Sequence, residues 1–291
     1  MEPAIRTLSL ADDGYPGLLR EIPGPAEQLF VRGTLPKADA AHIAIVGTRK
    51  ATAEGRTFAR TLARELAGRG AVVVSGLALG IDAAAHEGAI EGRGTTVAVL
   101  ANGLDTIYPA SHESLGRRIL ETGGCLVSEY PAGTPALPHR FLERNRIISG
   151  LSSAVVIIEA PSRSGSLATA RHAALQGREV FVVPGPARHP NFAGSHMLIR
   201  NGARLVTSAD EVLEDLGLEI AAPASETTAP ISPTARTILE LISKAKRALG
   251  LDEIAEAANI EPAAASEALT MLLLDGFIDE KRGHFIVRGT K

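Results

Sequence analysis

The chain of 291 residues has little that would cross-link it or anchor it in a membrane. Its single cysteine, Cys125, excludes an internal disulfide, and the apolar neighbours Leu126 and Val127 are typical of a buried thiol rather than a nucleophile. No apolar run approaches the roughly 20 residues that span a bilayer. The first residues also lack the basic and apolar segments of a signal peptide. We therefore expect a cytoplasmic protein without membrane contact.

The sequence is also poor in aromatic residues and in lysine. Tryptophan is absent, aromatic side chains make up 3% of the residues, and only six of the 30 basic residues are lysines. Arginine suits phosphate better than lysine does, because its planar guanidinium can donate two parallel hydrogen bonds. The net charge of −3 shows that the chain as a whole is not a basic nucleic-acid-binding protein. Only local clusters of arginine can therefore indicate contacts with phosphate.

Four runs of apolar, mostly β-branched residues each stop at a loop of small residues. Such runs are typical of parallel strands that are covered on both faces. In sheets of this kind the loops at the carboxyl ends of the strands bind the ligand. Backbone amides in glycine- and serine-rich loops, and at helix N-termini, bind anions and above all phosphate. The pattern therefore predicts a phosphate-binding surface. The runs are residues 43–46, 71–74, 97–100 and 155–158.

The distribution of apolar residues divides the chain into four segments. Residues 1–40 are expected to form an N-terminal extension packed on the core, with a helix at 8–21 and a strand at 28–32. Strands and helices alternate over 41–218, which predicts an α/β fold with a doubly wound, mostly parallel, Rossmann-like sheet. Residues 219–231 are rich in Ala, Pro, Ser and Thr and indicate a linker. Three helices and a hairpin over 232–291 predict a small C-terminal winged-helix domain.

The composition of the winged-helix segment argues against ordinary recognition of duplex DNA. Its expected recognition helix, EPAAASEALTMLLL, contains two glutamates and neither arginine nor lysine. A helix in the major groove needs hydrogen-bond donors for base edges and phosphates. We therefore favour a contact with protein, or docking within the molecule, for this domain. Double-stranded DNA remains the alternative partner.

Two familiar nucleotide-binding patterns are missing. The loop GTRKAT has one glycine where the dinucleotide fingerprint needs three, and Ser75 ends the second strand where an acidic residue would bind a ribose. The phosphate-binding pattern GxxxxGK[ST] is absent as well. Instead, Arg49 follows the backbone amides of Gly47 and Thr48, an arrangement that suits a phosphate. The alternative for Arg49 is a surface ion pair with Glu54.

The segment SGLALGIDAAAH, residues 75–86, is expected to run from a strand through a loop into a helix. Gly76 and Gly80 would let this loop approach a ligand closely. Asp82 and His86 are spaced one helical turn apart, so they could form an acid–base pair or hold a metal. No third metal ligand is spaced nearby, so we expect no metal site. We assign structural roles to Gly80, Asp82 and His86, with Asp82 capping the helix and orienting His86.

The densest basic cluster, RFLERNR at residues 140–146, includes an aromatic residue. Single-stranded nucleic acid is bound by a cationic track together with aromatic side chains that stack on bases. Phe141 could stack on a base or could face the core. At least one of Arg144 and Arg146 is expected to contact phosphate.

The segment Ser164-Gly165-Ser166 is expected to open a helix and to bind an anion there. In nucleotide-cleaving enzymes of the lysine-decarboxylase-like group, a related loop carries a catalytic glutamate shortly after its glycines. Here Leu167, Ala168 and Thr169 occupy that region, and none of them can act as an acid. We therefore expect no catalytic residue and no cofactor.

Taken together, eight motifs in order resemble the DNA-processing protein A family (DprA, also called Smf). They are VGTR, SGLALGIDAAAH, TVAVLANGLDTIYP, LVSEYPAG, FLERNRIISGLS, EAPSRSGSLATA, GREVFVVPG and LIRNGA. They cover roughly residues 15–215, and a family-like winged helix follows. The resemblance implies a homodimer that binds single-stranded DNA during natural transformation, protects the incoming strands and helps to load the RecA recombinase onto them. The implied DNA-binding residues are Gly47, Thr48, Arg49, Ser75, Gly76, Phe141, Arg144, Asn145, Arg146, Ser164, Gly165 and Ser166.

Two other functions remain possible. The same loops could serve a nucleotide N-glycosidase in which Asp82 or Glu159 acts as the acid. Alternatively, the protein could be a regulator that binds double-stranded DNA through its C-terminal domain.

Overall fold

The computed structural model describes residues 3–37, 39–218, 232–245, 247–274, 277–281 and 283–287. The expected linker at 219–231 lies outside these residues. The chain divides into two compact units, Met1–Pro223 and Ala224–Lys291.

The larger unit is built on a nine-stranded sheet in the order β1-β2-β6-β5-β4-β3-β7-β8-β9, as traced in the described residues. From β6 to β9 all neighbouring strands are parallel, whereas β2 pairs antiparallel with both β1 and β6. The predicted doubly wound, mostly parallel sheet is confirmed. The strands are β1 (Ile5–Ser9), β2 (Gln28–Gly33), β3 (His42–Val46), β4 (Val72–Ser75), β5 (Thr96–Val99), β6 (Cys125–Ser128), β7 (Ala154–Ile157), β8 (Glu179–Val182) and β9 (Arg204–Leu205).

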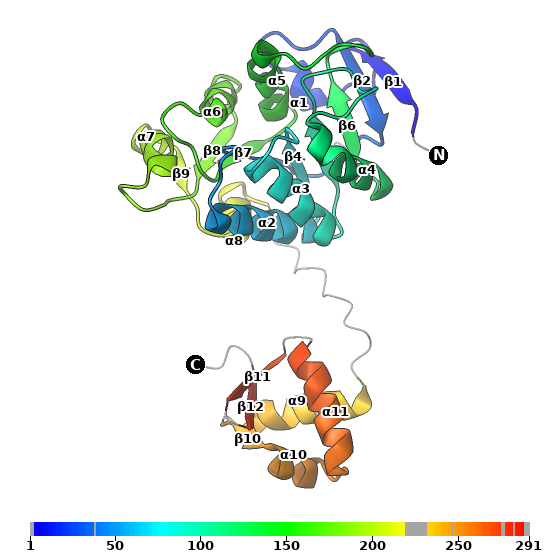
Figure 1. Ribbon diagram of the computed structural model, residues 1–291, viewed down its shortest axis with the longest axis vertical. Helices are drawn as coiled ribbons and strands as arrows, with labels where there is room; N and C mark the ends of the chain where they lie inside the picture. Colours follow the sequence, from blue (N-terminus) through cyan, green and yellow to red (C-terminus); the bar gives the residue numbers. More distant parts are fainter. Residues whose placement is uncertain are drawn as a thin grey trace. The chain divides into compact units, whose positions relative to one another are not determined.

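Helices cover both faces of this sheet (Figure 1). Alternate residues of a strand point to opposite faces, so Ile43 and Ile45 pack with α2, α3 and α8, while Ala44 and Val46 pack with α1, α5 and α6. This double coverage is the reason that the central strands β3, β4, β5 and β7 consist mostly of apolar residues. The helices are α1 (Gly17–Arg20), α2 (Ala53–Gly68), α3 (Ile81–Glu91), α4 (Glu113–Glu121), α5 (Pro138–Gly150), α6 (Gly165–Leu175), α7 (Ala193–Arg200) and α8 (Ala209–Asp215).

The N-terminal extension differs from the expectation. The helix expected at 8–21 is wrong, because residues Ile5–Ser9 form the edge strand β1 and only Gly17–Arg20 is helical. β1 takes the strand conformation because its backbone pairs with β2, which in turn pairs with β6. The strand expected at 28–32 is confirmed as β2. Tyr15 and Leu19 are buried, so the extension packs on the core of the larger unit.

The smaller unit has the predicted winged-helix architecture. Three helices pack against a sheet with the strand order β10-β12-β11, in which both pairings are antiparallel. Ile238, Ile254 and Leu269 form part of its core. The short strand β10 is an element that the sequence pattern did not reveal. The elements are α9 (Pro233–Ala245), β10 (Leu249–Gly250), α10 (Leu251–Ala258), α11 (Pro262–Leu274), β11 (Ile278–Lys281) and β12 (His284–Val287).

None of the helices found in the described residues combines the length and the apolar character needed to cross a bilayer.

Candidate functional site

The order of the strands places one crevice at a defined position. β3 and β7 are neighbours, and the chain continues from β3 to β4 on one side and from β7 to β8 on the other. In doubly wound sheets ligands bind outside the carboxyl ends of the strands at such a switch point. A cleft of about 440 Å³ opens here, within the range of about 300–1,000 Å³ that is usual for ligand sites. The loop after β3, the start of α6 and one side of α5 line it.

Two glycines bring the loop after β3 against the start of α3. Gly80 has a φ of +83°, and a Cβ at this position would lie 2.4 Å from the carbonyl oxygen of Thr48. A Cβ on Gly47 would lie 2.5 Å from Cγ1 of Ile81. Side chains at these positions would push the loop away from the helix. The close packing therefore determines where Arg49, the next residue of the loop, stands at the rim of the cleft.

Arg49 is exposed and stacks on an aromatic ring. Its Cζ lies 4.8 Å from the centroid of Phe141. The alternative ion pair with Glu54 is not formed among the described residues. A guanidinium that stacks on a ring keeps its N–H donors at the edge of its plane. Arg49 is thus held in place while its donors stay available to an anion in the cleft.

Arg144, by contrast, is buried, with 3% of its surface exposed. Its Nη1 donates to the carbonyl of Gly76 at 2.9 Å and to that of Val99. Burial lowers the pKa of Arg144 to about 10, so its side chain is still a cation at neutral pH. The nearby Asp82 is also buried, and burial raises the pKa of its carboxyl while Arg144 opposes that rise. Arg144 therefore ties α5 to the loop after β4 and to the end of β5, and it supplies positive charge to the cleft that it lines.

Asp82 and His86 do not have the expected partners. The Asp82 carboxylate accepts from the amides of Gly76 at 3.1 Å and Ala78 at 3.4 Å, so it fastens the preceding loop rather than capping α3. The N-cap of α3 is Gly80. Nδ1 of His86 lies 2.7 Å from the Thr96 hydroxyl, which itself donates to a backbone carbonyl. His86 Nδ1 must therefore carry the proton, and Thr96 rather than Asp82 orients the ring. Burial lowers the pKa of His86 to about 3, so the ring is neutral.

The opposite side of the cleft is the N-terminus of α6. Ser164 is its N-cap and accepts a hydrogen bond from the amide of Ser166 at 3.3 Å. The side-chain amide of Asn145 donates to the carbonyl of Gly165 at 3.2 Å and ties α5 to this turn. The amides and the partial positive charge of a helix N-terminus favour an anion. Arg163, exposed and adjacent, adds a second rim cation that the sequence analysis overlooked.

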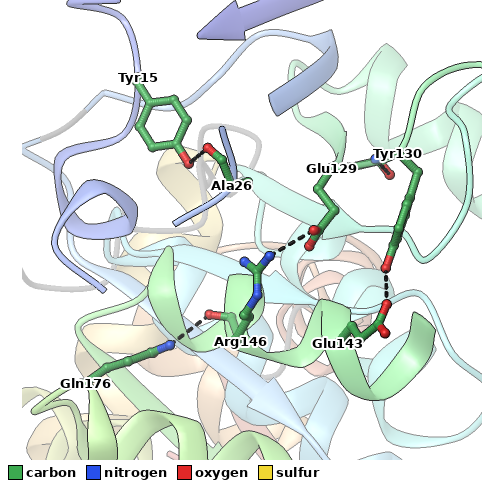
Figure 2. Close-up of polar contacts among 8 residues, drawn as sticks. Tyr15, Ala26, Glu129, Tyr130, Glu143, Arg146 and Gln176 are labelled. Atoms are coloured by element: carbon green, nitrogen blue, oxygen red, sulfur yellow. Dashed lines mark hydrogen bonds and ion pairs between the residues drawn. The ribbon is translucent and has the colours of Figure 1, made fainter. Parts of the chain in front are cut away.

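Three of the implied DNA-binding residues do not line this cleft. Ser75 is buried and donates to the carbonyl of Ile45 at 2.7 Å. Gly76 borders a smaller hollow next to the cleft. Arg146 does not line the cleft, because its guanidinium pairs with Glu129 at a distance of 2.8 Å. Figure 2 shows this contact. The remaining nine, namely Gly47, Thr48, Arg49, Phe141, Arg144, Asn145, Ser164, Gly165 and Ser166, all line it, together with Asp82.

Both carboxylates that could act as an acid are engaged. Of the described residues that line the cleft, Asp82 is the one with an acidic side chain. Its carboxylate is held by backbone amides and lies near Arg144. Glu159 is buried and accepts from the amide of Thr52 at 3.1 Å and from the side chain of Asn191 at 2.8 Å. Glu159 also accepts from the hydroxyl of Thr52, the N-cap of α2. Within the described residues, no group of three or more His, Cys, Asp or Glu side chains could hold a metal ion.

The fold and the cleft thus define a doubly wound α/β protein with a crevice at its topological switch point that is lined by arginines and a helix N-terminus, followed by a winged-helix unit. The family model for DNA recombination-mediator protein A matches residues 6–217, and the model for the DprA winged helix domain matches residues 222–284. The chain belongs to the DNA recombination-mediator protein A family.

Relatives of known sequence and structure agree with this assignment. Protein Smf of Escherichia coli strain K12 is 47% identical over 207 residues, a match that covers 71% of this chain and 53% of the relative. A putative DNA processing protein DprA of Mycobacterium tuberculosis is 42% identical over 252 residues, covering 83% of this chain and 63% of the relative. The chain therefore spans between half and two thirds of the length of these two relatives.

Two solved structures share the fold. The X-ray structure of DprA from Streptococcus pneumoniae has a TM-score of 0.69 and 39% identity, over 72% of this chain and 74% of that one. A structure of DNA processing protein A from Helicobacter pylori has a TM-score of 0.66 and 31% identity, over 74% of this chain and 98% of that one. The latter is described as giving insight into the single-stranded DNA binding mode of that protein.

Proposed function

We propose that the cleft binds the sugar–phosphate backbone of single-stranded DNA. The observation that carries this proposal is the convergence of the α6 N-terminus with Arg49 and Arg163 on one cleft. The acidic residue of this cleft, Asp82, is already held by backbone amides and is attracted electrostatically by the buried Arg144. Contacts of this kind are made to phosphate rather than to base edges, so sequence preference should be weak. The description of the H. pylori relative as a single-stranded DNA binder supports the same ligand.

The complete protein, in this proposal, is a non-catalytic recombination mediator of natural transformation. It protects incoming single strands, helps to load RecA onto them, and acts as a homodimer, which would extend the binding tract and raise avidity. Family membership supports this role, and the engagement of Asp82 and Glu159 in structural hydrogen bonds supports the absence of cleavage chemistry. The winged helix would contact protein, because α10 and α11 carry acidic residues and no basic ones.

The test is a titration of an oligo-dT strand over a series of salt concentrations. The logarithm of the affinity should fall linearly with the logarithm of the salt concentration, with a slope of several units. Arg49→Ala should weaken binding and reduce the slope by about 0.7 to 1, as expected for the loss of one phosphate contact. Arg146→Ala is the matched control because Arg146 pairs with Glu129 outside the cleft. If the protein ignores the strand even at low salt, the proposal is wrong.

The same preparation separates the alternatives. Release of free base from a nucleoside monophosphate would favour the N-glycosidase. Loss of all DNA binding on deletion of residues 232–291, with oligo-dT and duplex probes measured side by side, would favour the duplex-binding regulator. The mediator role predicts faster assembly of RecA filaments on strands that are already covered by a single-strand-binding protein.

A further inference from the structure

A second, smaller hollow adjoins the cleft and differs from it in chemistry. It has a volume of about 60 Å³ and is lined mainly by Leu79, Tyr108, Pro109 and Phe141, with Arg49 at the boundary. Arg49 and Phe141 line both the cleft and the hollow. The cleft offers amides, hydroxyls and arginines, whereas the hollow offers mostly apolar side chains. A nucleotide has the same division, with a charged phosphate and a flat base.

The ring of Phe141 is already largely occupied. Arg49 lies over it with Cζ 4.8 Å from the ring centroid, and Cζ of Arg144 is 6.0 Å from the same centroid. The ring of Tyr108 packs against it with a centroid separation of 5.6 Å and an angle of 55° between the planes. A base cannot lie between two rings inclined in this way, because stacking needs roughly parallel planes. Phe141 therefore positions Arg49 and Tyr108 and is not itself a free platform.

Tyr108 is the exposed member of this group. It keeps 48% of its surface accessible, as does Leu79 across the hollow. An aromatic ring that is fixed on one side by another ring and open on the other can accept a base of any identity, since every base has a π face.

We propose that Tyr108 is the residue that stacks on a base of the bound strand, with Phe141 as a positioning residue for Arg49. This inference rests on the proposed function, since it assumes that the backbone lies in the cleft. Arg49 borders both depressions, so a strand whose phosphate it contacts can place a neighbouring base over Tyr108. The expected ligand is any nucleobase, with weak preference among the four.

The experiment compares an oligo-dT strand with a fully abasic strand of the same length and charge. The wild-type protein should bind the dT strand more tightly by about 5- to 150-fold, the range expected for one stacked base. Tyr108→Leu should abolish this preference, while affinity for the abasic strand and its salt slope stay unchanged. Tyr108→Phe should retain the preference. Phe141→Leu should weaken the binding of both strands, because Arg49 loses its support.

Tyr130→Leu is the matched control. Tyr130 also follows a strand of the sheet at its carboxyl end, but its hydroxyl donates to Glu143 at 2.8 Å and its ring lies under Arg140, outside both the cleft and the hollow. Figure 2 shows its hydroxyl on Glu143. Its removal should leave the preference for the dT strand unchanged.

Fluorescence gives a direct readout that does not depend on affinity. The chain has three tyrosines and no tryptophan, and Tyr15 is buried. Stacking on Tyr108 should therefore quench tyrosine emission when dT is added, after correction for absorption by the strand. Tyr108→Phe should bind dT normally but lose this quenching.

Four results would overturn the inference. If the wild type bound both strands with equal, salt-dependent affinity, no base would stack on Tyr108, but the proposed binding of the sugar–phosphate backbone would still hold. If Tyr108→Leu kept the full preference for the dT strand, another residue would have to stack on the base. If Phe141→Leu lost this preference while Tyr108→Leu kept it, Phe141 would be that residue. Failure to bind either strand would sink the proposed function as well.

Discussion

The buried pair of Arg144 and Asp82 allows a quantitative prediction about stability. Arg144→Leu removes the cation beside Asp82 and two hydrogen bonds, to the carbonyls of Gly76 and Val99. Both side chains are buried, and they attract each other electrostatically without a direct ion pair. Removing the cation beside a buried carboxylate leaves that charge uncompensated, which for a directly paired group usually costs about 3–5 kcal/mol. We expect a loss of that size in the free energy of unfolding of the larger unit.

Asp82→Asn should cost less, because the oxygen of the introduced amide can still accept from the backbone N–H of Gly76. The double variant Arg144→Leu/Asp82→Asn should lose about 1.5–3 kcal/mol less than the sum of the two single losses. The reason is that the neutral amide at position 82 no longer needs a cation beside it. The measurement is urea unfolding followed by far-ultraviolet circular dichroism at pH 7, on the wild type and all three variants. Losses that add to within about 0.5 kcal/mol would show that the two side chains are not coupled.

The pH dependence of the stability of Arg144→Leu gives an independent check of this coupling between Arg144 and Asp82. Because burial raises the pKa of Asp82, the folded state holds this proton more tightly than the unfolded state does. Stability attributable to Asp82 therefore falls as the pH rises from the unfolded pKa through the folded one. Without Arg144, which opposes the rise, the folded pKa should lie higher. The deficit of Arg144→Leu should accordingly shrink as the pH is lowered from 7, and a constant deficit would contradict the argument.

Three further outcomes are expected. Burial lowers the pKa of His86 to about 3, whereas the unfolded chain has a pKa of about 6.5. The free energy of unfolding of the wild type should therefore fall by about 2 kcal/mol when the pH is lowered from about 7.5 to about 5. His86→Gln can still donate to Thr96 and should lose this pH dependence, as measured by urea unfolding at the two pH values. Gly80→Ala should destabilise the fold by about 2–4 kcal/mol and weaken dT binding, because its φ is +83° and its Cβ would meet the Thr48 carbonyl; a normal melting temperature would contradict this. Cys125 is buried, and burial raises the pKa of its thiol to about 12. The thiol should therefore react with an aromatic disulfide reagent only after the protein is unfolded in urea. Rapid reaction of the native protein would show that the thiol is accessible.

Much of the fold could be predicted because the relevant information is local. Strands such as 43–46 are apolar on both faces, and the loops that follow them contain glycine and serine, so the sheet and its ligand-binding edge follow from composition and order. The helix expected at 8–21 failed for two reasons: residues 10–15 form turns and bends that include Gly14 and are followed by Pro16, and its first residues, Leu8 and Ser9, belong to a strand whose partner is non-local. Ile5–Ser9 forms a strand because β2 offers it an edge to pair with, and no periodicity within the segment records that partner.

The basic cluster on α5 shows why the site was only partly predictable. Arg144 and Arg146 are two residues apart, which places them about 200° apart around a helix. Phe141, Arg144, Asn145 and Ile148 follow helical spacing and face the cleft, while Arg146 faces Glu129. Helical periodicity could have separated the two arginines. It could not have shown that Arg144 is buried, since that depends on the carbonyl of Gly76 in the loop after β4 and on that of Val99 at the end of β5.

The sequence by itself determined the parallel sheet, the winged-helix unit and the small, glycine- and serine-rich loops at the strand ends, because each follows from residues that are neighbours along the chain. Only the tertiary structure decided which charges remain available. Arg49 stays open to a ligand because it stacks on Phe141, whereas Arg144 and Glu159 are engaged by groups that lie far away in sequence. Tyr108 likewise became a candidate only when folding placed it beside Phe141 at the edge of the cleft. Availability depends on burial and on partners, and both are properties of the packed molecule.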